Sequence, residues 1–192
     1  MDEQELIQAS KKGELDCFNQ LVITYQKQVY NFALRMVNRP ETAEDITQET
    51  FLSAFRSIGS FKGGSFRAWL FRIASNSCYD QMRRWQRKPS SSLEALQAEA
   101  KLADPVDKGE SPEEHVLRRE LAGVLREGLA DLPEDQRAIV ILSDIQGFSY
   151  EEMAEATRTP LGTVKSRLNR GRAHLRSFLL KHGELLPGRF RQ

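Results

Sequence analysis

The chain has 192 residues, 40% hydrophobic and 29% charged, which suits one ordinary domain or two small ones. No apolar run approaches the roughly 20 residues of a membrane span, and the acidic start is not expected to be a secretory signal. Two cysteines, Cys17 and Cys78, exclude a disulfide scaffold and a CxxC zinc motif, so a cytoplasmic location is expected.

Charge is segregated along the chain, although the net charge is only +1. Residues 67–88 hold six Lys or Arg and one acid, and residues 155–176 hold the same numbers. Between them, residues 89–114 hold seven acids and two lysines. Two basic stretches on either side of an acidic one indicate two contacts with a polyanion.

Apolar residues recur at helical spacing through the first half of the chain. They predict a helix over 18–36, which Asn38-Arg39-Pro40 ends, and a second helix over 41–58. The glycine-rich composition of 59–65 predicts a loop, and a third helix is expected over 66–87. The first half is therefore expected to be a helical bundle.

A second helical unit follows residues 89–112, whose Ser-, Asp- and Glu-rich composition predicts a flexible acidic linker. Leu132-Pro133-Glu134 starts a helix, with Pro at its first position, and Gly147 ends that helix. Ser149 and Glu152 form a capping box at the start of a short helix. The chain as a whole is thus predicted to be all-α.

A tight turn and a long basic helix complete the second unit. Pro160 opens this helix, with Thr159 as its N-cap, and the helix continues to about Leu180. A short helix, a turn and a longer basic helix are typical of a helix-turn-helix. The apolar residues expected to form its core are Ile139, Val140, Leu142, Ile145, Met153, Ala154, Leu161, Val164, Leu168 and Leu175.

The long basic helix is predicted to bind duplex DNA. Side chains near the N-terminus of such a helix reach base edges, and Arg or Lys suits guanine while Asn suits adenine. The alternative is a solvated helix in an ordinary bundle. The side chains expected on its accessible faces are Lys165, Ser166, Asn169, Arg170 and Arg172.

The helix over 41–58 carries a face of acidic and polar residues, since spacings of three and four bring side chains together. Such a face is often simply solvated. The functional alternative is a docking surface for a basic protein partner, because phosphates would repel it from DNA. The residues on this face are Glu41, Glu44, Asp45, Gln48 and Glu49.

The helix over 66–87 combines a basic face with interleaved aromatic residues, which is how proteins hold single strands by stacking unpaired bases. Trp69 is expected in the core, whereas Phe61, in the glycine-rich loop, is expected to be exposed. The residues that line the basic face are Arg72, Asn76, Asp80, Arg83 and Arg87.

Two sets of motifs resemble bacterial sigma factors. The motifs that resemble sigma region 2 are Ala43–Phe51, Ser60–Gly63 and Trp69–Asn76. Those that resemble sigma region 4 are Leu132–Glu134, Gly147–Ala154 and Gly162–Arg167. Their order, the acidic linker and the short chain resemble the extracytoplasmic-function (ECF) class of the sigma-70 family. The resemblance covers residues 17–87 and 113–176.

The resemblance implies a factor that binds core RNA polymerase, recognises duplex −35 DNA, and melts and captures the −10 element to start transcription. It implies region 2 in residues 1–88, a linker in 89–112, region 4 in 113–181 and a tail in 182–192. Many ECF factors are held inactive by an anti-sigma factor, so such a partner is expected here. No cofactor, metal ligand or membrane span is expected.

The resemblance also implies particular site residues. Docking on the β′ clamp of polymerase is expected from Glu44, Asp45, Gln48, Glu49 and Phe51, while the second unit would sit on the β flap. Binding of −10 DNA is expected from Phe61, Lys62, Gly63, Arg72, Asn76, Asp80, Arg83 and Arg84. Binding of −35 DNA is expected from Thr163, Lys165, Ser166, Arg167, Asn169 and Arg170.

Three other functions are weighed against a sigma factor. An enzyme is disfavoured, because the sequence has no glycine-rich phosphate loop and its three histidines lack partners at metal spacing. A conventional helix-turn-helix regulator would bind an operator alone and have no use for the acidic helix. A single-strand or RNA-binding protein would bind strands without a −35 preference.

Overall fold

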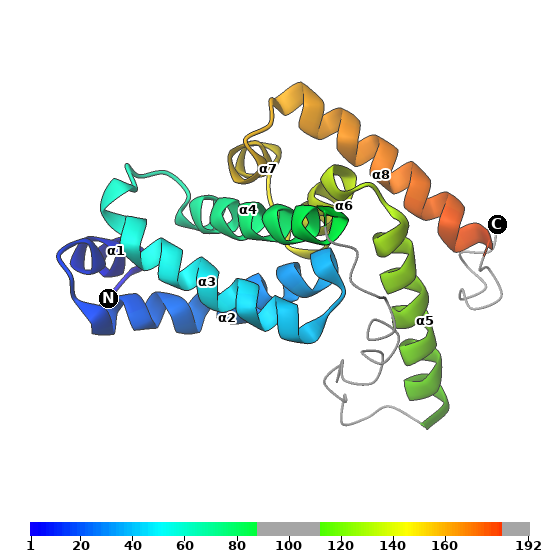
Figure 1. Ribbon diagram of the computed structural model, residues 1–192, viewed down its shortest axis with the longest axis horizontal. Coiled ribbons are helices and arrows are strands. Elements are labelled where there is room, and N and C mark those ends of the chain that lie inside the picture. The colour runs from blue at the N-terminus through cyan, green and yellow to red at the C-terminus, as the bar shows by residue number, and fades with distance from the viewer. Residues whose placement is uncertain (88–111, 182–192) are drawn as a thin grey trace.

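The computed structural model describes residues 1–87 and 112–181 (Figure 1). The expected linker and tail therefore lie almost wholly outside the described residues. The first half contains α1 (Glu3–Lys11), α2 (Leu15–Val37), α3 (Pro40–Ser57), the single-turn helix η1 (Ile58–Ser60) and α4 (Phe66–Arg87). The second half contains α5 (Pro112–Asp131), α6 (Glu134–Val140), the π-helical turn η3 (Ile141–Ile145), α7 (Tyr150–Thr157) and α8 (Leu161–Lys181). The predicted all-α fold is confirmed for these residues.

The turn between α2 and α3 follows from its sequence. Asn38 adopts the left-handed conformation, with φ of 53°, and its amide donates to the Leu34 carbonyl to close α2. Pro40 then occupies the first position of α3, where its missing amide costs no hydrogen bond. The predicted break at 38–40 is confirmed, and α2 and α3 run antiparallel on either side of it.

Helix α1 is not among the helices that the sequence predicts. A capping box starts it, since the Glu5 amide donates to Asp2 Oδ1 at 2.8 Å and the Asp2 amide donates to Glu5 Oε2 at 3.0 Å. The Tyr25 hydroxyl of α2 also donates to the carboxylate of Glu3. The bond from Tyr25 holds α1 against α2, and α1 also packs beside η1.

The starts of α6 and α8 differ by one residue from the prediction. Pro133 and Pro160 each precede the helix and supply the carbonyl that accepts its first amide bonds. Thr159 is therefore not the N-cap of α8. Its hydroxyl instead donates to the Thr157 carbonyl at 3.1 Å, within the turn.

Most residues predicted for the core of the second half are inside, but two are not. Ile145 and Leu161 are exposed, because each lies at the end of its helix, where the apolar stripe turns toward solvent. Fully buried side chains there include Leu132, Ile139, Leu142, Met153 and Leu168.

The two halves pack against each other in the described chain. Figure 1 shows α4 lying between the α2–α3 pair and the helices α6, α7 and α8. Phe71 of α4 contacts Phe148, just before α7, with ring centroids 4.9 Å apart. Buried residues of both halves belong to a continuous apolar core. Among the residues described, no helix is long and apolar enough to cross a membrane.

Candidate nucleic-acid and polymerase interfaces

A short helix, a tight turn and a long helix place α8 on the surface of the second half. The Glu152 amide donates to Ser149 Oγ at 3.1 Å and the Ser149 amide donates to Glu152 Oε2 at 3.0 Å, so the predicted capping box of α7 is confirmed. Arg158 closes α7 in the left-handed conformation, with φ of 49°. The chain then reverses sharply into α8.

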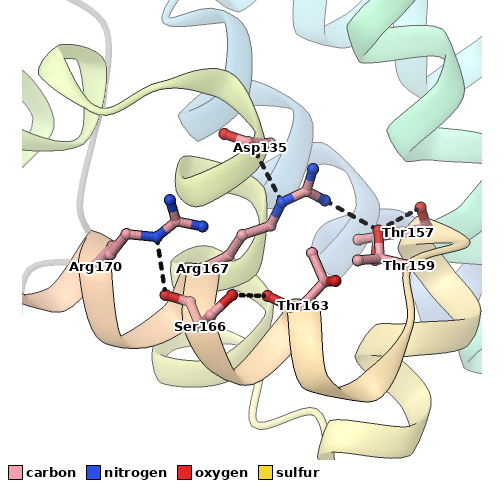
Figure 2. A network of polar contacts seen from close by, with 7 residues as sticks. All are labelled: Asp135, Thr157, Thr159, Thr163, Ser166, Arg167 and Arg170. Carbon is pink, nitrogen blue, oxygen red and sulfur yellow. Dashed lines mark hydrogen bonds and ion pairs between the residues drawn. The ribbon is translucent and has the colours of Figure 1, made fainter.

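Arg167 connects α8 to both neighbouring elements. Its Nε lies 2.8 Å from Asp135 Oδ2 of α6, and its Nη1 donates to Thr159 Oγ1 at 3.0 Å (Figure 2). The side chain is only 27% exposed. This predicted −35 residue is therefore engaged within the protein, where it fixes α8 and the turn relative to α6.

The other predicted −35 residues lie along the open side of α8. Lys165, Ser166, Asn169 and Arg170 are exposed and Thr163 is half-buried. Ser166 Oγ donates to the Thr163 carbonyl at 3.0 Å, and Arg170 Nε donates to the Ser166 carbonyl at 3.3 Å (Figure 2). The bond from Arg170 goes to an uncharged carbonyl, and Lys165 Nζ lies 5.5 Å from the centroid of the Tyr150 ring, so both charges can still meet phosphate or guanine.

Two further residues of α8, Arg172 and His174, contact acids of the second half. Arg172 pairs with Asp144 and donates to it through Nε at 3.0 Å. His174 Nε2 lies 2.8 Å from Asp131 Oδ2. The bond from Arg172 holds the pKa of Asp144 below its usual value. These pairs connect α8 to α5 and η3.

The acidic face of α3 is open to solvent with one exception. Glu44, Asp45, Gln48 and Glu49 are exposed, but Phe51 is only 8% exposed. Phe51 is buried in the core together with Ile46 and Ala54, so its side chain is not part of the exposed acidic face, and a role in docking stays a prediction. Phe51 precedes the fully buried Ala54 by three positions, which places both residues on the inner side of α3.

A groove lies between α2 and α3 beside this acidic face. It is open, about 430 Å³ in volume, and is lined by Gln26, Lys27, Tyr30, Glu44, Thr47 and Gln48. Burial, reinforced by Glu44, raises the pKa of the Tyr30 hydroxyl. The groove residues of α2 were not predicted. The docking surface was predicted from the acidic residues of α3, and α2 has few charged residues.

Two exposed apolar side chains continue the groove. Ile23 of α2 is 65% exposed and Leu52 of α3 is 52% exposed. Each lies one helical turn beyond the groove residues Lys27 and Gln48, toward the same end of the antiparallel pair. Apolar residues flanked by charge are typical of a protein-binding surface.

The predicted −10 surface on α4 is partly as expected. Asn76, Asp80, Arg83 and Arg84 are exposed, and Arg72 is half-buried. Arg83 Nη2 lies 2.8 Å from Asp80 Oδ1, so one charge of the basic face is offset within the helix. Lys62 and Gly63 are exposed in the loop before α4.

Phe61 is buried, so its expected exposure is wrong. It is 6% exposed, and its ring lies 5.7 Å from Phe66 and 5.5 Å from Trp69, centroid to centroid. Lys11 of α1 lies over the same ring, with Nζ 5.5 Å from the centroid. The apolar walls of α4 and the unforeseen α1 cover this loop residue, while Trp69 is in the core as expected.

The fold and these surfaces define an RNA polymerase sigma factor. Residues 21–88 match the model of sigma-70 region 2, and residues 122–175 match that of sigma-70, region 4. The RNA polymerase sigma-H factor of Pseudomonas aeruginosa is 36% identical over 173 residues, which are 88% of this chain and 90% of that protein. The chain belongs to the extracytoplasmic-function class of the sigma-70 family.

Two solved structures are similar to this chain. The sigma factor RpoE of Bartonella quintana, bound to the anti-sigma factor NepR, has a TM-score of 0.65 and 30% identity, covering 84% of this chain and 96% of that one. CnrH, bound to the cytosolic domain of CnrY, has a TM-score of 0.67 and 27% identity, covering 92% and 96%. The matched ranges fall within the units 1–88 and 113–181, whose boundaries stay a prediction.

Proposed function

We propose that this chain brings core RNA polymerase to promoters by using three separate surfaces. The acidic face of α3 and the adjoining α2–α3 groove bind the β′ clamp. The open side of α8 binds duplex −35 DNA, and the loop 61–65 with α4 binds the melted −10 strand. The observation that carries the proposal is the exposure of an acidic face and a basic helix on one chain.

The docking step is an encounter between opposite charges followed by apolar contact. Glu44, Asp45 and Glu49 attract a basic surface and set its orientation. Ile23 and Leu52 then lose water, which supplies affinity that charge alone does not. The exposed acids also disfavour any competing approach of DNA to this face.

The −35 step divides the residues of α8 by role. Lys165, Ser166 and Asn169 face base edges, and Arg170 binds phosphate, which positions the helix without selecting sequence. Arg167 acts through Asp135 and Thr159 to hold the helix at its angle. The β flap would support this unit from the side away from DNA.

The −10 step uses single-stranded DNA. Asn76 and Arg72 on α4 and the exposed loop around Lys62 and Gly63 would meet a strand after melting. Phe61 supports this loop from beneath. The proposed −10 site is thus a polar and cationic surface above a buried aromatic residue. The protein would act in the cytoplasm, where RNA polymerase acts.

Regulation by an anti-sigma factor is part of the proposal. The chain is similar to a sigma factor solved with its anti-sigma factor. An inhibitor that covers the α2–α3 groove would compete directly with polymerase, because the same exposed residues would serve both.

Equilibrium pull-down with bacterial core RNA polymerase tests the docking assignment. Wild type is compared with Glu44→Lys/Glu49→Lys and with a control of equal charge change, Glu120→Lys/Glu127→Lys, on exposed positions of α5. The α3 variant should lose core binding by at least about tenfold, or 1.4 kcal/mol, and the α5 variant should not. Equal binding by both variants at moderate salt would overturn the assignment.

A further inference from the structure

The junction between the two halves is built around Arg67, in the first turn of α4. Its guanidinium lies over the Phe148 ring, with Cζ 4.2 Å from the ring centroid, and its Nη2 donates to the Gln146 carbonyl. Gln146 Nε2 in turn donates to the Gln28 carbonyl at 3.2 Å. Arg67 and Gln146 thereby join α4 and α2 to the segment that precedes α7.

Other contacts across the junction are also polar. Ser65 Oγ donates to Glu152 Oε1 of α7 at 3.0 Å. Arg137 Nη1 of α6 donates to the Met36 carbonyl of α2 at 2.6 Å. The ring contact between Phe71 and Phe148 supplies the apolar part. The junction therefore combines polar contacts with the continuous apolar core that the two halves share.

Some buried polar atoms at this junction lack a hydrogen bond. In the described part of the chain these atoms include Gln28 Oε1, Arg67 Nε and Arg137 Nε, and all three residues also reach across the junction. A buried polar atom without a partner costs free energy that water returns when the atom is exposed. Separation of the halves therefore satisfies three atoms that closure leaves unsatisfied.

The position of Arg67 suits a second partner. It follows directly on the loop with the exposed residues Lys62, Gly63 and Gly64. Its bond to the Gln146 carbonyl neutralises no charge, and an aromatic face is a weaker partner for a guanidinium than a phosphate is. Opening of the junction would leave a full positive charge at the edge of the loop.

We propose that Arg67 is a phosphate-binding residue of the −10 surface that closure of the two halves masks. In the closed chain its guanidinium is stacked on Phe148. On separation it turns to a backbone phosphate of the melted strand, which favours the open form. This inference rests on the proposed function, because it takes the melted −10 strand as the partner.

Two variants separate a masked DNA contact from a simple latch. Arg67→Ala removes both the junction contact and the proposed phosphate contact. Gln146→Ala removes the side-chain bond to Gln28 but leaves the Arg67 guanidinium. Both should increase the radius of gyration of the free protein in small-angle X-ray scattering, with helical circular dichroism unchanged.

Their effects on DNA should have opposite signs. The first probe is a fluorescent oligonucleotide with the non-template −10 sequence of a promoter that core polymerase transcribes in the presence of this chain. The second probe is the same strand with its sequence scrambled. Gln146→Ala should bind both strands roughly three- to tenfold more tightly than wild type. Arg67→Ala should bind both strands roughly three- to tenfold more weakly than wild type. The slope of log affinity against log salt should fall by about 0.7 in Arg67→Ala and be kept in Arg67→Lys.

Equal tightening of strand binding by Arg67→Ala and Gln146→Ala would overturn the inference, since Arg67 would then be a latch without a DNA role. An unchanged salt slope in Arg67→Ala would also overturn it. Failure of the proposed function is measured separately, as loss of core-polymerase binding by wild type in the pull-down. Strand binding by the free chain tests Arg67 even in that case, with a random-sequence strand as the probe.

Discussion

Arg167 of α8 forms an ion pair with Asp135 of α6, with Nε and Oδ2 2.8 Å apart, and the same guanidinium donates to Thr159 in the turn before α8. Tyr79 of α4 lies close enough for the charges of Arg167 and Asp135 to affect its pKa. Burial raises its pKa to about 12, with Asp135 reinforcing and Arg167 opposing the shift. Arg167, which fixes α8 relative to α6, is thus placed beside the first half.

The account predicts different roles for Arg167 and Arg170. Asp135→Asn should lower −35 affinity and cost roughly 1 kcal/mol of unfolding free energy, because the pair is partly exposed and one neighbouring bond survives. It should leave the salt slope of duplex binding unchanged. Arg170→Ala should instead reduce that slope by about 0.9 with stability unchanged, as fluorescence anisotropy over a salt series measures.

An exposed leucine on α3 provides a test of docking that is independent of charge. Leu52→Asp should weaken binding to core polymerase by about tenfold, since Leu52 continues the groove and the change places a carboxylate in an apolar contact. Leu180→Asp, on an exposed position of α8, is the matched control. Surface plasmon resonance with immobilised core polymerase compares them, and equal losses would contradict the groove assignment.

Acid should weaken the bond between Asp144 and Arg172. The folded-state pKa of Asp144 lies below the ordinary 3.8, chiefly because Arg172 donates to the carboxylate. Its contribution is therefore complete above the unfolded-state pKa and is lost as pH falls through the folded-state value. The contribution is under about 1 kcal/mol, since both side chains are partly exposed. Unfolding in urea from pH 6 to 2 should show this loss in wild type but not in Asp144→Asn.

The packing of α6 against α8 requires glycine at one position. A Cβ on Gly171 would lie 2.7 Å from Val140 Cγ2, which is a short, stiff side chain in the core. Gly171→Ala should therefore lower the free energy of unfolding by about 1–3 kcal/mol, despite the better helix propensity of alanine. Gly123→Ala on α5 meets nothing within 4 Å and should be neutral or stabilising in the same denaturant experiment.

Local sequence was enough to predict most of the helices and the capping box of α7, though not α1 or the start of α8, because turns and capping boxes depend on residues three or four positions apart. The break at Asn38-Arg39-Pro40 and the capping box of Ser149 and Glu152 are confirmed for this reason. The exposed positions on α8 followed from helical periodicity. The class of protein followed from motifs in both halves together.

The rest of the site depends on contacts between distant segments. Phe61 is buried because α1 and α4 close over it, and local composition indicated only a loop. Arg167 is paired because Asp135 of α6 comes to lie beside α8. The junction of Arg67 with Gln146 and Phe148 joins segments 79 residues apart or more. No spacing rule within one helix could have predicted these contacts.

Run-off transcription tests the central claim most directly. Core RNA polymerase is combined with a promoter library in the presence and absence of this chain, and the transcripts are sequenced. The account predicts promoter-specific transcripts that require the chain, with enriched −35 and −10 sequences, and their loss with Glu44→Lys/Glu49→Lys. Absence of transcripts, while the chain alone still shifts a duplex operator, would contradict the account and indicate a conventional helix-turn-helix regulator.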